Sequence, residues 1–109
     1  MYVVDSGIRV SHEEFEGRAS PLIDFSKQLP QICAEGDHNG AADERSHGTF
    51  CAAITGGRTY GVAPGATIKA VNRGSGLSDS CAAIDWIIQN GASRRALIEL
   101  WLSWLLPYK

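Results

Sequence analysis

Met1-Tyr2-Val3-Val4-Asp5-Ser6-Gly7 is the stretch of sequence that decides the fold. Its first five residues are a β-rich apolar run that opens into Ser-Gly, which predicts a buried strand ending in a turn. Further along, Ser46-His47-Gly48-Thr49 places a histidine among small residues where a helix can begin. An aspartate at the carboxyl end of a parallel strand faces the sheet edge at which α/β proteins place their sites. His47 could turn its ring toward Asp5 there, and the pair would supply two of the three members of a hydrolytic triad.

The rest of the chain alternates between strand and helix patterns. We expect strands over residues 19–25 and 66–71, one helix from Ser46 to the Gly56-Gly57 stop, and another over residues 78–90. Residues 26–45 are polar and contain glycines, which predicts a long surface loop. This alternation predicts an α/β fold with parallel strands.

Local patterns predict how the helices begin and which faces they bury. Ser11 and Glu14 have the spacing of a capping box, so Ser11 is expected to cap a single helical turn. Ser78 or Asp79 is expected to cap the longer helix. Helical spacing predicts two buried faces, one formed by Phe50, Cys51, Ala53 and Ile54, and one by Ala82, Ala83, Trp86 and Ile87.

Composition narrows the class of protein. Hydrophobic residues make up 44% of the 109 residues and charged residues 20%, which is typical of one small globular domain. The net charge of −2 argues against nucleic acid as a partner, because no basic face can neutralise phosphates. No run approaches the ~20 apolar residues of a membrane span, and no basic or apolar signal segment follows Met1. Three cysteines, Cys33, Cys51 and Cys81, allow one disulfide and a thiol or three thiols.

Three motifs, in order, carry a resemblance to subtilisin-like serine proteases. Residues 3–19 resemble the region around the catalytic aspartate of that family, most closely in its proteinase K branch. Residues 46–54, Ser-His-Gly-Thr-Phe-Cys-Ala-Ala-Ile, resemble its histidine motif, and residues 56–66 are similar to the segment that follows. Residues 82–91 look like the next helix, so the resemblance covers residues 1–25 and 46–93.

The resemblance implies a fold, an activity and a site. The fold would be part of a subtilisin-like three-layer α/β fold with a mostly parallel central sheet, truncated at both ends. Asp5 would be the orienting carboxylate and His47 the general base of a serine endopeptidase. Gly74, Ser75 and Gly76 resemble the strand edge along which a peptide or protein substrate is laid. Secretion is usual in the family, and calcium is common in it, although no calcium ligands can be identified here.

Departures from the family pattern are mild around the pair and larger near the substrate edge. Ser46 and Ala53 replace glycines and Phe50 replaces a second histidine. After Val71 the chain continues Asn72-Arg73-Gly74, in place of Lys-Val-Leu and a longer glycine-rich loop. Cys51 matches the cysteine that lies beneath the histidine in the proteinase K branch, and we expect a buried thiol there, since nothing nearby would lower its pKa.

The nucleophile has no counterpart in these 109 residues. The family's Gly-Thr-Ser-Met-Ala segment and its oxyanion asparagine are absent, and Ser103 stands between Leu102 and Trp104 without a glycine elbow. Residues 1–93 are therefore expected to be the N-terminal part of a peptidase domain, and residues 94–109 a divergent apolar tail that forms a strand or short helix. A shifted reading frame or a mispredicted exon would explain that tail, and the transcript sequence tests this hypothesis.

Three functions follow from these patterns. The first is a serine endopeptidase by family that is inactive as this chain alone, because it lacks the serine. The alternative is a non-catalytic fragment that binds a peptide or partner at residues 74–78. A metal site formed by His12, Asp37, His38 and His47 fits no zinc spacing, and surface histidines explain these residues better.

Overall fold

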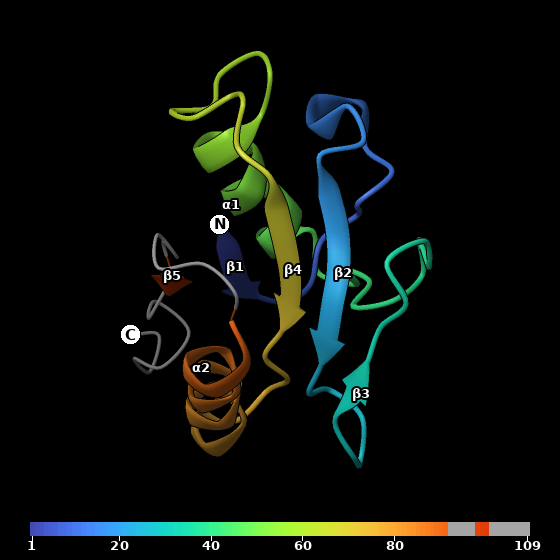
Figure 1. The fold of residues 1–109 in the computed structure, drawn as a ribbon, viewed down its shortest axis with the longest axis vertical. Coiled ribbons are helices and arrows are strands. Elements are labelled where there is room, and N and C mark those ends of the chain that lie inside the picture. The colour runs from blue at the N-terminus through green and yellow to red at the C-terminus, as the bar shows by residue number, and fades with distance from the viewer. Residues whose placement is uncertain (92–97, 101–109) are drawn as a thin grey trace.

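A five-stranded sheet forms the centre of the protein, and the computed structural model describes residues 1–91 and 98–100 (Figure 1). The strand order is β3-β2-β4-β1-β5. Pairing is parallel between β1 and β4, β1 and β5, and β2 and β4, whereas β3 runs antiparallel to β2. The strands are β1 (Tyr2–Asp5), β2 (Ala19–Asp24), β3 (Gln31–Ile32), β4 (Ile68–Asn72) and β5 (Ile98–Leu100). The predicted α/β fold with a mostly parallel sheet is confirmed.

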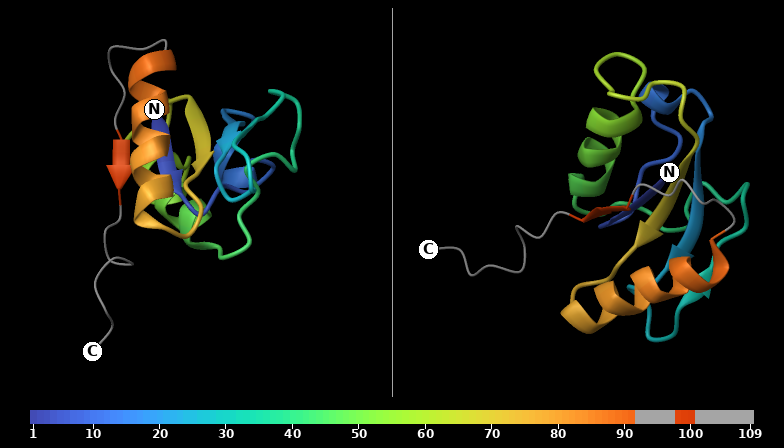
Figure 2. Two further views of the ribbon diagram at one scale, coloured as in Figure 1. Left: turned by 90° about the horizontal axis from the view of Figure 1, so that it is seen from below. Right: turned by 60° about the vertical axis from the view of Figure 1, so that its left-hand side comes forward.

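Two helices cover opposite faces of this sheet and make three layers (Figure 2). Because side chains alternate along a strand, Val3 packs with Ala52 of α1 (His47–Gly56), and Val4 packs with Ala83 and Ile87 of α2 (Leu77–Asn90). The α1 layer also contains Phe15 of η1 (Glu13–Phe15), a short 3₁₀ helix. No helix in residues 1–91 has the length and apolar character needed to cross a bilayer.

Polar residues end the three adjacent strands β1, β4 and β2. Asp5 is in register with Asn72, and Asn72 is in register with Asp24. All three residues are buried, and they lie at the carboxyl edge of the sheet. This edge is the place where parallel sheets put their sites, so the fold directs attention to Asp5 and its neighbours.

The predicted buried face of α1 is correct for Cys51, which is buried, and partly correct for Ala53, which is partly buried, but it is wrong for Phe50 and Ile54. Phe50 is 63% exposed and Ile54 is 40% exposed. Besides Cys51, the helix buries Gly48, Ala52, Thr55 and Gly56. A Cβ on Gly48 would lie 1.9 Å from the Gly7 carbonyl oxygen, and one on Gly56 would lie 2.9 Å from Ile68 Cδ1. The helix therefore approaches the sheet so closely that only small side chains fit between them.

The predicted caps of η1 and α2 are also wrong, although each helix begins within about two residues of the predicted position. His12, not Ser11, caps η1, and its Nδ1 accepts a hydrogen bond from the Glu14 N–H at 3.1 Å. Helix α2 begins at Leu77 after Gly76, without a side-chain cap, so Ser78 and Asp79 already lie inside its first turn. On α2 the stripe holds for Ala83 and Ile87, which are buried, and for Trp86, which is partly buried, whereas Ala82 is exposed.

The structure also adds detail to two segments, the predicted loop over residues 26–45 and the predicted apolar tail over residues 94–109. The loop predicted over residues 26–45 contains β3, whose residues Gln31 and Ile32 are both exposed. Within residues 94–109, the described part is a strand that pairs with β1, with Tyr2 opposite Ile98. Ser103 and the rest of that segment lie outside the described residues. The cysteines, all within the described residues, form no disulfide: Cys51 is buried, Cys33 is half-buried and Cys81 is exposed.

Candidate active site

Asp5 and His47 meet at the carboxyl edge of the sheet. Asp5 is the last residue of β1 and His47 is the first residue of α1. The His47 Nδ1 lies 2.8 Å from Asp5 Oδ1 and 2.9 Å from Oδ2. The Ser6 N–H also donates to Asp5 Oδ1, at 2.6 Å. A carboxylate that accepts the Nδ1 proton fixes the tautomer in which Nε2 is the unprotonated nitrogen, and such a nitrogen can act as a base.

Burial of the Asp5 carboxylate strengthens its interaction with His47. The Asp5 side chain is 5% exposed and the His47 side chain is 24% exposed. The carboxylate is therefore shielded from water, while the imidazole still reaches the surface. Two charges that approach in such surroundings interact more strongly than in bulk water, so an imidazolium at His47 would be stabilised by Asp5.

Two glycines allow the helix to bring His47 onto Asp5. A Cβ on Gly48 would lie 3.2 Å from Asp5 Cβ as well as 1.9 Å from the Gly7 oxygen. Gly7 has a φ of +100°, in the region that favours glycine, and a Cβ there would lie 2.3 Å from the Ala41 oxygen. Both positions therefore require glycine. At Gly48 the first turn of α1 rests directly on the turn after β1, and at Gly7 that turn rests against the backbone of residues 41–42.

The first turn of α1 is capped from outside the helix. Ser46 precedes the helix with a φ of 64° and forms no side-chain cap. The Gly48 N–H donates instead to Ser6 Oγ at 3.0 Å, and the Thr49 N–H donates to Asp43 Oδ2 at 2.9 Å. Sequence reasoning missed Ser6 and Asp43. An acidic residue shortly before a helix start was the available signal, because a helix N-terminus favours negative charge.

Cys51 lies one turn beyond His47, beneath the imidazole. Its Sγ is 3.7 Å from His47 Nδ1, and the residue is buried, as expected. Ligand atoms of Asp5, His47 and Cys51 lie within 4.8 Å of one another. A donor set with thiol and imidazole does not suit calcium, which takes oxygen ligands. Within the described residues, His12, Asp37 and His38 do not form a ligand cluster with His47.

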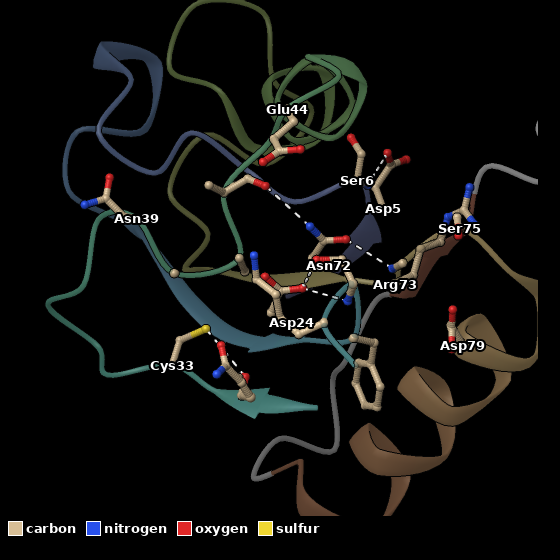
Figure 3. Close-up of a pocket in the computed structure, with 18 of the residues that line it drawn as sticks. Asp5, Ser6, Asp24, Cys33, Asn39, Glu44, Asn72, Arg73, Ser75 and Asp79 are labelled. Carbon is tan, nitrogen blue, oxygen red and sulfur yellow. Dashed lines mark hydrogen bonds between the residues drawn. The ribbon is translucent and has the colours of Figure 1, made fainter. Parts of the chain in front are cut away.

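A cavity of about 960 Å³ opens beside Asp5 (Figure 3). Asp5 and His47 line it together with Gly74 and Ser75, two of the three residues expected at the substrate edge. Gly74 has a φ of 70°, and its N–H donates to Asn72 Oδ1 at 3.1 Å. Gly76 is the residue before α2 and is not among those that line the cavity.

The sequence profile of the Subtilase family matches residues 2–93. The chain belongs to the subtilase family. The extracellular serine proteinase of Thermus sp. (strain Rt41A) is 43% identical to this subtilase over 94 residues, which cover 82% of this chain and 21% of that protein. Subtilisin-like protease 2 of Pseudogymnoascus destructans (strain ATCC MYA-4855 / 20631-21) is 37% identical over 105 residues, covering 92% of this chain and 24% of that protein.

A solved structure agrees with the family. The crystal structure of a cold adapted subtilisin-like serine proteinase superposes with a TM-score of 0.66 at 34% identity. The match covers 82% of this chain and 31% of that chain. The predicted membership in the family is confirmed. The subtilase chain spans a quarter or less of the length of the two relatives named above.

Proposed function

We propose that this subtilase chain supplies the general base and the orienting carboxylate of a serine endopeptidase. The observation that carries the proposal is the 2.8 Å contact between His47 Nδ1 and Asp5 Oδ1. The two residues come from two separate motifs of the chain and are brought together by β1 and α1. A buried carboxylate that orients an accessible imidazole is the arrangement that activates a serine hydroxyl.

Each residue has a defined part in the reaction. Asp5 accepts the Nδ1 proton, keeps the ring in one orientation and stabilises the imidazolium. His47 takes a proton from the serine hydroxyl through Nε2 and then gives it to the leaving amine of the peptide. No described residue is assigned as the serine, so the acyl-enzyme step requires a hydroxyl from another segment. We expect the isolated 109-residue chain to show no measurable peptidase activity.

The cavity beside the pair supports a peptide as its substrate. Gly74 and Ser75 line it beside His47, and a peptide laid along residues 74–76 would pair with their backbone. We therefore propose a peptide or protein as the substrate. Secretion is proposed with it, on the ground that the Thermus relative is named an extracellular proteinase.

A chimera tests the proposal. Residues 2–93 would replace the aligned segment of the Thermus proteinase, and hydrolysis of a chromogenic peptide would be measured. We expect an active enzyme in which His47→Ala and Asp5→Ala lower kcat by factors of the order known for subtilisin, about 2 × 10⁶ and 3 × 10⁴. His38→Ala, at an exposed histidine, is the matched control and should keep full activity. An active chimera whose His47→Ala variant retains its rate would contradict the proposal.

A non-catalytic peptide-binding fragment is the second candidate. The observation in its favour is that the cavity and part of its proposed edge are formed within this chain. Calorimetric titration of the isolated chain with short peptides tests it. Binding without hydrolysis, together with an inactive chimera, would favour this function over the first.

A further inference from the structure

Asp43 connects the two segments that carry the candidate pair. Its Oδ1 accepts hydrogen bonds from Ser6 Oγ at 2.7 Å and from the Arg45 N–H at 3.0 Å. Its Oδ2 accepts from the Thr49 N–H at 2.9 Å and from Thr49 Oγ1 at 2.6 Å. One carboxylate oxygen therefore faces the turn after β1, and the other faces the first turn of α1.

The partners of Asp43 are the immediate neighbours of the pair. Ser6 follows Asp5 directly, and Thr49 stands two residues after His47. The bonds also close a ring, because Ser6 Oγ donates to Asp43 and accepts from the Gly48 N–H at 3.0 Å. A rotation of α1 that moved His47 away from Asp5 would have to break several of these bonds at once.

We propose that Asp43 is the positioning residue that holds the His47 ring on Asp5. The inference deepens the proposed function, since it concerns the same pair, but it makes a claim about geometry that needs no turnover. Asp43 itself is not placed against the reacting atoms. It acts through Ser6 on one side and Thr49 on the other.

Electrostatics supports the same role. A negative charge at a helix N-terminus is favourable because the first N–H groups lack partners inside the helix. Burial alone would raise the pKa of the Asp43 carboxyl, but hydrogen bonds from the Thr49 and Ser6 side chains, and from the Thr49 and Arg45 backbone, bring that pKa below its usual value. The carboxylate is therefore ionised across the neutral range and accepts all four bonds.

The local sequence explains why a carboxylate outside the helix is needed. The residue before α1, Ser46, has a left-handed backbone conformation and does not cap the helix with its hydroxyl. Without Asp43, the Thr49 N–H would lose its partner, and the hydrogen bond between Ser6 and the Gly48 N–H would lose the anchor that orients Ser6. A side-chain cap from Ser46 would also bond the first N–H groups of the helix. It would not, however, connect the helix start to Ser6, the residue after Asp5.

The test measures the His47 ring directly in the full chain. The chain would be labelled with ¹⁵N-histidine, and NMR would follow the His47 Nδ1–H proton and the ratio of the two ring tautomers. We expect the Nδ1–H tautomer to dominate in the wild type. In Asp43→Ala, exchange of that proton with water should become about tenfold faster or more, as expected if roughly 1.4 kcal/mol of ordering is lost, and the tautomer ratio should fall.

Glu44→Ala is the matched control, because it removes an exposed acidic residue next to Asp43 and should leave the His47 signals unchanged. The backbone amide spectrum shows whether each variant is folded. A folded Asp43→Ala variant with the wild-type His47 exchange rate and tautomer ratio would overturn the proposal. An equal effect of Glu44→Ala would overturn it too, because the loss of a negative charge, and not the loss of the Asp43 hydrogen bonds, would then explain the change at His47.

Ser6→Ala breaks the same connection from the other side and decides the question if Asp43→Ala fails to fold. It should speed the exchange of the His47 Nδ1–H proton and lower the tautomer ratio, as Asp43→Ala does. Where Asp43→Ala folds, the two effects should not add in the double variant. Unchanged His47 signals in Ser6→Ala, or additive effects, would count against the connection. An inactive chimera would refute the proposed peptidase function and leave this NMR result standing.

Discussion

Helices α1 and α2 flank the same sheet, but they pack on it by different means. Helix α1 buries Gly48, Ala52 and Gly56, and it leaves Phe50 and Ile54 exposed. Helix α2 buries Ala83 and Ile87 and rests Trp86 against the same cluster. Close backbone approach thus holds α1, whereas an ordinary apolar stripe holds α2.

The difference has a chemical consequence. Helix α1 delivers His47 to within 2.8 Å of Asp5, and that distance depends on glycines and on bonds to Asp43 and Ser6. Helix α2 supplies buried apolar area to the opposite face of the sheet. We therefore expect substitutions at the start of α1 to disturb the pair and the fold together, and substitutions on α2 to change stability alone.

The largest effect is expected at Gly48, the second residue of α1. In Gly48→Ala the new Cβ would lie 1.9 Å from the Gly7 oxygen, so the backbone must shift. We expect a loss of about 3 kcal/mol or more in the free energy of unfolding, measured by urea denaturation. Ser78→Ala, at the second residue of α2, is the matched control and should stay within about 0.5 kcal/mol. Equal free energies of unfolding for the two variants would contradict the claim that α1 packs more closely on the sheet than α2 does.

The next effect concerns the apolar stripe of α2. Ile87 is 4% exposed, so Ile87→Ala should lower the free energy of unfolding by about 2–4 kcal/mol. Ile88 is 72% exposed, and Ile88→Ala should change it by less than about 0.5 kcal/mol. At urea concentrations where both variants are still folded, each should keep the wild-type NMR signal of the His47 Nδ1–H proton. A displaced signal in folded Ile87→Ala would show that α2 also positions the pair.

The smallest effect is expected on the pH dependence of the free energy of unfolding, to which the Asp43 carboxylate contributes. Since its pKa is lower in the folded chain, its stabilisation is complete above the unfolded value of about 4 and is lost as pH falls through the lower folded value. Urea midpoints should therefore decline below about pH 4 in the wild type, and Asp43→Asn should make that decline shallower. An unchanged slope in the variant would mean that the Asp43 bonds do not favour the folded state.

The sequence predicted these regions unequally for physical reasons. On α2 the helical period identifies Ala83 and Ile87 correctly, because side-chain size decides what is buried there. On α1 the same rule selects Phe50 and Ile54, which are exposed, because close packing admits only small residues and reverses the usual pattern. A hydrophobic period cannot signal such a contact.

The pair itself could be predicted from its motifs, whereas of its support only an acidic residue near the start of α1 could be. Asp5 and His47 each stand in a recognisable local pattern, and the fold brings their side chains together as expected. Asp43 forms its bonds to residues 6 and 49, so its importance depends on a tertiary arrangement. Strand β3 was missed for a similar reason, since its two exposed residues show no apolar alternation and are ordered by pairing with β2.

A double-mutant cycle in the chimera tests most directly whether Asp5 and His47 act as one unit. The ratio kcat/KM would be measured for the parent, for Asp5→Ala, for His47→Ala and for the double variant. Groups that work as a unit give strongly non-additive losses, so the double variant should be no slower than His47→Ala within a few-fold. If the two single losses multiply in the double variant, the carboxylate and the imidazole act independently, and the account is wrong.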